Sequence, residues 1–260
     1  MIKINYSVTK PVILDIPPPP TPFTSDFSLL HDGVNEYSNI GSSPVYEFGV
    51  NLPFSVSLWF NRQGGTKYLI SRRLNNGTTF RGWSLLILNN IFEFALVDDD
   101  AAGKRKVRKH NVTVPTFAWI HLVVTYDGSG TIGGMRIYFD GVESGNYVTV
   151  ADGTLDTISV TTPLHIGALE GAVTFKGNID DVDIWDRALI QAEITSLNNL
   201  GAPLDTTTHA ASANLIGSWG MGDLSTFSGG NWTITDRSPS GLDAVTVNME
   251  EADRVTDVPS

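Results

Sequence analysis

The chain has 260 residues, of which 41% are hydrophobic and 17% are charged, enough to bury one sizeable core and too apolar for a disordered protein. No cysteine is present, which excludes a disulfide framework, a thiolate metal site and a cysteine nucleophile. The net charge of -11 argues against a surface that binds nucleic acid or anionic lipid as a whole, and we expect one large domain, with or without an appendage.

Prolines set the N-terminal residues 1–26 apart from the remainder of the chain. Proline fixes φ and removes a backbone donor, so a run of prolines favours extended polyproline II over a helix or a central strand. We predict an extended arm that anchors the chain to other proteins; a stiff linker or a frayed terminus is the alternative. The prolines of the run are Pro17, Pro18, Pro19 and Pro20.

No segment predicts membrane insertion or a cleaved signal. The first ten residues are polar, and the apolar run that follows, residues 11–16, is interrupted by Asp15 and ends in the prolines. No stretch approaches the roughly 18 apolar residues that span a bilayer. We expect a protein that is soluble when made.

From residue 27 to about residue 200, short strand-like segments alternate with turns at a spacing that favours an all-β sandwich. Large apolar side chains occupy every second position of residues 54–60. Asn89-Asn90 and Asp140-Gly141 are typical of tight hairpin turns, because these residues tolerate a positive φ. The predicted strands cover residues 54–60, 83–88, 91–97, 119–126, 135–139, 163–168 and 177–185, and one more begins at Val142.

One helix is predicted, over residues 189–199. Leu189, Ile194 and Leu197 recur at helical spacing, and Gly201 follows as a residue type suited to the position after a helix. Ile190 stands three residues before Glu193, where a serine would complete a capping box, and its side chain cannot cap the helix.

The tail, residues 201–260, shifts toward Thr, Ser, Gly, Asn and Asp but keeps short apolar groups such as Trp232 to Ile234 and Val245 to Val247. A separate domain of about 60 residues without cysteine or metal would be marginally stable. We therefore expect the tail to complete or decorate the sandwich formed by residues 27–200.

Six segments resemble a known family in the order of the chain. Residues 119–127 read Trp-Ile-His-Leu-Val-Val-Thr-Tyr-Asp, and residues 177–185 read Gly-Asn-Ile-Asp-Asp-Val-Asp-Ile-Trp. Both resemble strands of the laminin-G-like and concanavalin A-like lectin/glucanase jelly rolls. The resemblance implies an all-β, antiparallel β-sandwich jelly roll with one short helix, a proline-rich arm before it and a strand-bearing tail after it. The other matching segments are residues 30–37, 54–60, 136–141 and 163–167.

Two pieces of the tail, residues 215–223 and 235–241, resemble parts of the family that precede the jelly roll in many relatives. Here they follow it. The order is compatible with a circular permutation within one domain and with a strand donated to a neighbouring subunit, and both alternatives stay open at this point.

The sequence does not favour an enzyme. A retaining glucanase of the family carries Glu-x-Asp-x-Glu on one strand, to set two carboxylates about 5 to 5.5 Å apart. The acidic strand here, residues 180–183, contains no glutamate. Since the fold alone assigns no activity, we predict a non-catalytic protein.

The resemblance does suggest a structural calcium ion. Asp181 aligns with an aspartate that contributes to a calcium site in similar jelly rolls, and Asp32 near the first strand could join it, because calcium prefers carboxylate and carbonyl oxygens. The alternative is that both aspartates cap turns and face water. No other cofactor is predicted.

Sugar binding by such modules rests on exposed aromatic rings with polar neighbours. Four of the six tryptophans fall at positions typical of packing; they are Trp59, Trp119, Trp185 and Trp219. Trp83, beside Arg81, and Trp232, beside Asn231, are less constrained. We predict these four residues as candidate contacts to a sugar.

The densest charge feature is a basic run that follows Asp98, Asp99 and Asp100. We consider a hairpin with cross-strand ion pairs, each contributing at most about 1 kcal/mol, and a contact patch for an acidic partner, which could be a second copy of this chain. Nucleic acid is not expected, because no aromatic residues are interleaved. The run consists of Lys104, Arg105, Lys106, Arg108 and Lys109.

Together these features predict a non-enzymatic structural or adhesion protein of a virus particle, such as a bacteriophage head decoration or tail component. It would be made in the host cytoplasm, join other virion proteins or further copies through its arm, and present a jelly roll that binds host surface glycans. The alternative is a carbohydrate-binding module of a cell-surface or extracellular assembly.

Overall fold

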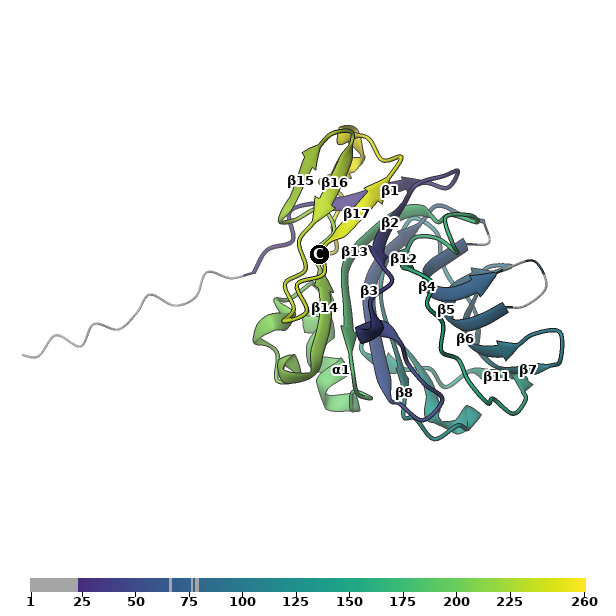
Figure 1. Ribbon diagram of the computed structural model, residues 1–260. Coiled ribbons are helices and arrows are strands. Elements are labelled where there is room, and N and C mark those ends of the chain that lie inside the picture. The colour runs from purple at the N-terminus through teal and green to yellow at the C-terminus, as the bar shows by residue number, and fades with distance from the viewer. Residues whose placement is uncertain (1–22, 66, 76, 78–79) are drawn as a thin grey trace, which may run out of the picture.

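Figure 1 shows a sandwich of two antiparallel β-sheets with one short helix on its outer side. This computed structural model describes residues 23–65, 67–75, 77 and 80–260. The predicted arm prolines, Pro17, Pro18, Pro19 and Pro20, lie outside the described residues. The fold confirms the expected jelly-roll class.

Sheet A has eight strands, and its central strand is β13. One edge of β13 pairs with β3, while the other edge pairs with β1 along its first half and with β14 along its second half. In spatial order the strands are β10 (Val142–Glu143), β9 (Met135–Phe139), β8 (Trp119–Tyr126), β3 (Phe54–Arg62), β13 (Lys176–Trp185), β1 (Ser28–Asp32) and β18 (Arg254–Val255), with β14 (Leu215–Trp219) beside β13.

Sheet B has ten strands and combines segments from the beginning, middle and end of the chain. Its first five strands come from residues 67–152, and the tail, residues 201–260, supplies its last three. In spatial order they are β11 (Tyr147–Asp152), β7 (Lys104–Thr113), β6 (Ile91–Asp99), β5 (Phe80–Leu88), β4 (Lys67–Asn75), β12 (Leu164–Ile166), β2 (Tyr37–Gly41), β17 (Ala244–Val247), β16 (Asn231–Ile234) and β15 (Ser225–Ser228).

The main core lies between the two sheets and follows from the alternation of side chains along each strand. On β3, the four large apolar residues predicted to share one face are fully buried, among them Phe54 and Phe60. Phe54 packs on the opposite sheet, where its ring centroid lies 5.4 Å from that of Trp83 and 6.0 Å from that of Phe94.

Two hairpin turns form where the sequence indicates them. Asn89 and Asn90 join β5 to β6 with φ of 52° and 66°, and Asp140 and Gly141 join β9 to β10 with φ of 50° and 78°. Residues with two successive positive φ angles match the twist of the flanking strands, which is why Asn and Gly are favoured there.

Residues 201–260 add strands to both sheets of their own chain. β14 pairs with β13, β18 pairs with β1, and β17 continues sheet B beyond β2. Of the two arrangements left open by the sequence, this structure has the tail strands packed within one chain.

Helix α1 (Gln191–Asn198) packs on the outer face of sheet A. Its Ile194 and Leu197 are buried against Trp185 of β13 in a second apolar cluster. The helix is shorter than predicted, because Asn199 already adopts the left-handed conformation with φ of 42° and Leu200 follows with φ of 61°. The predicted helix, residues 189–199, thus began two residues too early and ended one residue too late, and Asn199 takes the left-handed position that we expected of Gly201.

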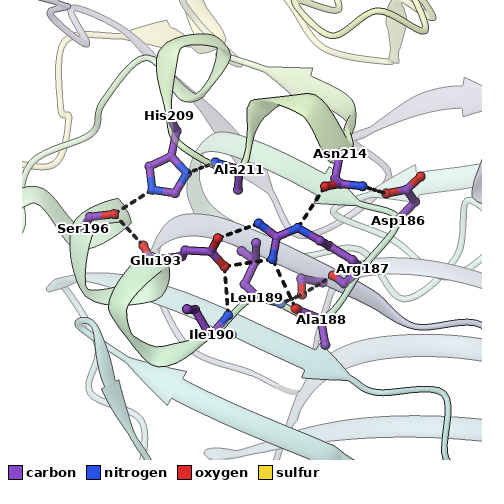
Figure 2. A network of polar contacts seen from close by, with 11 residues as sticks. Asp186, Arg187, Ala188, Leu189, Ile190, Glu193, Ser196, His209, Ala211 and Asn214 are labelled. Atoms are coloured by element: carbon purple, nitrogen blue, oxygen red, sulfur yellow. Dashed lines mark hydrogen bonds and ion pairs between the residues drawn. The ribbon is translucent and has the colours of Figure 1, made fainter.

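The start of α1 is held by an arginine in place of a capping side chain (Figure 2). Glu193 accepts the Ile190 N–H at 3.0 Å, and the Arg187 guanidinium donates to both oxygens of the same carboxylate at 2.9 and 2.5 Å. Arg187 Nε also donates to Asn214 at 3.0 Å. The network therefore fastens the helix to the loop that leads into β14.

Short 3-10 turns join several of these elements. In the described part of the chain, none of the helices has the length and apolar character that crossing a bilayer requires. The 3-10 turns are Pro44–Tyr46, Ile132–Gly134, Asn199–Gly201, Thr206–Thr208, Ser212–Asn214 and Glu251–Asp253.

We expect Arg187→Ala to lower the free energy of unfolding by about 2 kcal/mol, since it removes charge-assisted hydrogen bonds from a partly buried carboxylate. Arg136→Ala is the control: Arg136 pairs with Glu143 at the same 2.5 Å, but its side chain is 49% exposed, and its loss should cost about 0.5 kcal/mol or less. Urea denaturation measures both. Equal losses for the two variants would contradict the role of the Arg187 network.

Candidate functional site

Three aspartates meet at a bulge in the centre of β13. Asp180 pairs with Trp59 and Asp183 pairs with Ser57, so β13 advances three residues while β3 advances two. Asp181 takes up the extra residue with φ of 38°, a left-handed conformation that non-glycine residues rarely adopt. Because Asp180 and Asp183 pair with residues of the outer face, the bulge directs this acidic cluster away from the core.

The three aspartates of the acidic cluster are buried, and each has a partner from a distant segment. Ser25 donates to Asp180 at 2.6 Å, Thr206 donates to Asp183 at 2.7 Å, and Arg237 pairs with Asp181 at 3.0 Å. The cluster therefore joins the N-terminal segment, the loop after α1 and the tail at one point of sheet A.

Burial dominates the electrostatics of this cluster. It raises the pKa of Asp181 to about 7 against the opposing effect of Arg237, and it raises the pKa of Asp183 to about 6. Burial, and then the Asp181 carboxylate, raise the pKa of Asp180 well above its ordinary value. Three buried carboxyls that share one nearby arginine are thus harder to ionise than carboxyls in water.

A small enclosed cavity of about 10 Å³ lies beside this cluster, under α1. Asp181 Oδ2 has no hydrogen-bond partner there, and His121 Nε2 lies 2.8 Å from Ser57 Oγ beneath the ring of Trp59. The volume suits one water molecule and is far too small for a sugar ring. The cluster itself is therefore not a ligand pocket.

Outside this cavity, a groove of about 750 Å³ opens on the same side of sheet A. Leu204 borders both the groove and the small cavity. The groove is lined by Phe23, Thr24, Asp26, Asn199, Pro203, Leu204, Asp205, Thr208, Asp223 and Leu224. We call it the acidic groove, because Asp26, Asp205 and Asp223 line it and no Lys, Arg or His side chain does so in the described part of the chain.

The outer face of sheet B forms a second candidate surface. Trp83 and Leu85 of β5 point into the core, so Gly82 and Ser84 point outward. Register then places Arg73 beside Gly82 and Val97, and places Tyr68 in a row with Leu86, Glu93 and Lys109. We call this surface the arginine face and define it by Tyr68, Arg73, Phe80, Ser84, Glu93 and Lys109.

Arg73 is the unusual member of the arginine face. Its guanidinium lies 5.0 Å above the ring centroid of Phe80 and 3.5 Å from Ser84 Oγ, while its Nε has no partner. Although the residue is only 8% exposed, no carboxylate among the described residues lies within ion-pair distance of it. Burial accordingly lowers the pKa of Arg73 from its ordinary value.

The other charged members of the face are paired. Glu93 contacts Lys109 at 2.7 Å across the β6–β7 hairpin. Burial raises the pKa of Tyr68, whose hydroxyl interacts with Arg73. Arg73 is thus a planar donor group over one aromatic ring and beside the Tyr68 hydroxyl, and its Nε has no hydrogen-bond partner.

Both predicted sugar-stacking tryptophans are buried, so the expectation that their rings are exposed was wrong. Trp83 is 1% exposed and lies between the sheets, and Trp232 is 4% exposed and donates to Glu250 O at 2.9 Å. Their polar neighbours are occupied as well: Arg81 pairs with Asp98 at 3.1 Å, and the Asn231 amide faces the Thr246 carbonyl.

The predicted calcium pair does not converge. Asp32 pairs in register with Lys176, five residues before Asp181 on β13, which separates the two aspartates by roughly 16 Å. Asp32 instead accepts the Val34 and Asn35 N–H groups and closes a turn, as the alternative interpretation expected. No group of three or more ligand-type side chains that could hold a metal ion occurs among the described residues, so these two aspartates do not fit a shared ion.

The basic run on β7 is satisfied within its own chain. Four of its cations pair with Asp or Glu side chains, and Arg108 donates to the Met135 carbonyl and lies over the ring of Tyr147. The prediction of an acidic partner assumed unpaired basic side chains, and the structure pairs them within the chain. The alternative interpretation, a hairpin with cross-strand ion pairs, describes the segment. The pairs are Lys104 with Asp156, Arg105 with Asp100, Lys106 with Asp152 and Lys109 with Glu93.

Sequence reasoning missed the arginine face. The strand β4, which carries Tyr68 and Arg73, was not predicted. A usable signal was present on β5, where Phe80, Gly82 and Ser84 alternate with Trp83 and Leu85, and this pattern indicates which residues point away from the core. No local sequence pattern indicates that Arg73 lacks a carboxylate partner.

Comparison with known proteins supports the jelly-roll fold described above. The sequence profile of the concanavalin A-like lectin/glucanases superfamily, in its laminin G form, matches residues 32–195. That span contains β2 to β13 and the start of α1, which is more than half of the chain. No curated protein matches the chain.

Solved structures share the fold at low sequence identity. A candidate carbohydrate binding protein from Bacteroides ovatus aligns with a TM-score of 0.63 and 17% identity over 92% of this chain and 62% of its own. The chain therefore spans less than two thirds of that protein. The CBM40 domain of the Ruminococcus gnavus IT-sialidase, bound to α2,3-sialyllactose, aligns with a TM-score of 0.52 and 13% identity over 68% of this chain and 99% of the domain.

We expect Trp83→Ala to lower the free energy of unfolding by about 3 to 5 kcal/mol, since it leaves a large cavity between the sheets. Leu52→Ala, at a side chain that is 52% exposed, should change it by about 0.5 kcal/mol or less. Thermal and urea denaturation provide the comparison. A Trp83→Ala protein as stable as the Leu52→Ala protein would show that Trp83 is not a core residue.

We expect Asp183→Asn to change how stability depends on pH. The raised pKa of Asp183, about 6, means that it contributes stability below its unfolded pKa near 4, and that this contribution is lost as the pH rises through 6. Asparagine keeps an acceptor for Thr206 and cannot ionise. The unfolding free energy of Asp183→Asn should therefore rise relative to that of the wild type as the pH rises, by at most about 3 kcal/mol at pH 8.

Urea denaturation of both proteins at intervals from pH 4 to pH 8 tests the Asp183 prediction. The informative quantity is the difference in unfolding free energy between variant and wild type at each pH. A difference that stays constant over this range would contradict a raised pKa of Asp183.

Proposed function

Because this chain belongs to the concanavalin A-like lectin/glucanases superfamily, we propose that it is a non-catalytic carbohydrate-binding jelly roll whose ligand face is the arginine face of sheet B. The observation that carries the proposal is the guanidinium of Arg73, which is buried and oriented without a carboxylate partner. A buried charge of this kind is costly unless a ligand completes its hydrogen bonds.

The chemistry of the face suits a sugar. A guanidinium presents a fixed fork of donors that matches vicinal hydroxyls or a carboxylate, and aromatic rings cover the apolar side of a pyranose. Arg73 lies over the Phe80 ring and interacts with the Tyr68 hydroxyl, while Gly82 and Ser84 lie on the same face of the sheet. The first ligand class to test is a sugar acid, which the neighbouring CBM40 fold binds as sialyllactose.

The same face is poorly suited to hydrolysis. Retaining glycosidases need two carboxylates about 5 to 5.5 Å apart, one of them free to protonate the leaving group. Glu93 is the one carboxylate among the six residues that define the face, so the face lacks the second carboxylate, and Glu93 is already paired with Lys109. The proposed activity is therefore binding.

In a finer form of this proposal, the chain is an adhesion component of a virus particle, anchored through residues 1–26. The arrangement of the described residues supports it: residues 23–27 lie on the outer side of sheet A, across the sandwich from β4, β5 and β6 (Figure 1). An anchor on that side would leave the arginine face directed toward a cell surface. Electron microscopy of particles labelled with antibody to this chain tests the location.

We expect the wild-type chain to bind a carboxylate-bearing glycan, and Arg73→Ala to weaken that binding at least about tenfold, since one bidentate contact is lost. Arg73→Lys should retain part of the affinity, because it keeps the charge and loses the fork. Calorimetry with sialyllactose and with neutral lactose supplies the affinities, after a glycan array has identified the best ligand.

Arg81→Ala is the matched control, because Arg81 lies on β5 near Arg73 but pairs with Asp98. Its affinity should equal that of the wild type. Equal affinities for the wild type and Arg73→Ala would show that the glycan does not bind at Arg73. If no glycan on the array binds the chain, the result would count against carbohydrate binding. Release of reducing sugar from a glycan would contradict the non-catalytic assignment.

A further inference from the structure

The described lining of the acidic groove contains three carboxylates and no Lys, Arg or His side chain. The carboxylates are Asp26, Asp205 and Asp223, and Asp181 and Asp183 line the small cavity that adjoins the groove at Leu204. Burial, and to a smaller degree the Asp26 carboxylate, raise the pKa of Asp223. A positive group in the groove would relieve this repulsion.

The arginines nearest to the groove are already engaged. Arg237 pairs with Asp181, and Arg254 lies 3.7 Å above the ring centroid of Phe27. Asp181 Oδ2 nevertheless remains without a partner, although the residue is only 3% exposed and faces the small cavity that adjoins the groove at Leu204. None of the three lining carboxylates takes part in an ion pair among the described residues, although Asp205 accepts a hydrogen bond from Thr207 and Asp223 accepts one from the Asp26 N–H.

The groove also has an apolar edge. Leu224 lines it and is 66% exposed, and Leu200, next to the lining residue Asn199, is fully exposed. Both leucines have left-handed backbone conformations, with φ of 53° and 61°. These two leucines give the acidic groove an apolar side that aliphatic residues of a bound segment could contact.

One segment of this protein has the complementary composition. Residues 1–22 contain two lysines, Lys3 and Lys10, and one acidic residue, Asp15. The lysines stand among aliphatic residues, with Val12, Ile13 and Leu14 shortly after Lys10. A lysine followed by aliphatic side chains matches a groove with acidic walls and a leucine edge.

We propose that the acidic groove is the docking site for the N-terminal segment of a second copy of this chain, with Lys3 or Lys10 placed among Asp26, Asp205 and Asp223. The segment would associate copies through exchanged arms. This inference concerns the side of the sandwich opposite the arginine face and does not depend on glycan binding.

The proline run favours a second copy over the segment's own groove. Phe23 lines the groove of its own copy. The run Pro17 to Pro20 comes shortly before it in the sequence, and a run of prolines does not favour the tight reversal that a return to the same groove would require. Such a stiff segment loses little entropy when it docks on a neighbouring copy.

Analytical ultracentrifugation of the full chain provides the first test. The wild type should associate with rising concentration, and high salt should weaken the association. Lys3→Glu/Lys10→Glu and Asp26→Lys/Asp205→Lys should each weaken it at least about tenfold, and an equal mixture of the two variants should restore it. Glu251→Lys, an exposed acid outside the groove, should associate like the wild type.

The absence of cysteine allows a direct second test. When Lys10→Cys and Leu224→Cys proteins are mixed and oxidised, a disulfide can form only between copies, and we expect a covalent dimer of the two. Thermal unfolding verifies that each variant is folded. Asp26→Lys alone, at an exposed position, is the milder variant if Asp205→Lys disturbs its loop.

Several results would overturn the proposal. The wild type could remain monomeric at all concentrations, or the Lys3→Glu/Lys10→Glu protein could associate as the wild type does. Association that requires calcium and is indifferent to both lysines would make a metal ion the occupant. A Lys10→Cys/Leu224→Cys double variant that forms its disulfide within one copy at high dilution would assign the groove to its own arm.

Discussion

The ion pair between Asp181 and Arg237 joins the centre of β13 to the tail, and most of sheet A depends on that junction. β13 is the strand that pairs with β3, β1 and β14 together. Its bulge turns three carboxylates outward into a region that α1, the N-terminal segment and the tail then bury. Without Arg237 and the hydroxyls of Ser25 and Thr206, such burial would be strongly unfavourable.

That junction also explains why the two outer faces of the sandwich differ. On sheet A, the segments that approach the acidic cluster bring apolar residues with them, so the face is covered by Leu197 and its neighbours. On sheet B, the outward residues of β4 to β7 mix apolar and polar side chains, with a small apolar cluster around Ala95, Val97 and Val107 beside Arg73 and Glu93. The two faces therefore differ in how their charged groups are paired.

The architecture was largely predictable because it rests on local patterns. Alternation of side chains identified β3, β8 and β13, and the Asn89-Asn90 and Asp140-Gly141 turns identified two hairpins. The helix was placed correctly but ended too late in the prediction, because Asn199 adopted the left-handed conformation ahead of the glycine. Motif order then assigned the fold class.

Where the sequence analysis was wrong, the error came from long-range packing. Chain neighbours such as Arg81 do not show that Trp83 points between the sheets, and proximity of motifs does not show that Asp32 and Asp181 are separated along β13. The sequence by itself determined the strands, the turns and the absence of thiol chemistry, since these follow from residue type and spacing. Only the tertiary structure decided which charges are paired: the basic run on β7 is neutralised, while Arg73 is left without a carboxylate, because pairing depends on strand register and burial between segments far apart in the chain.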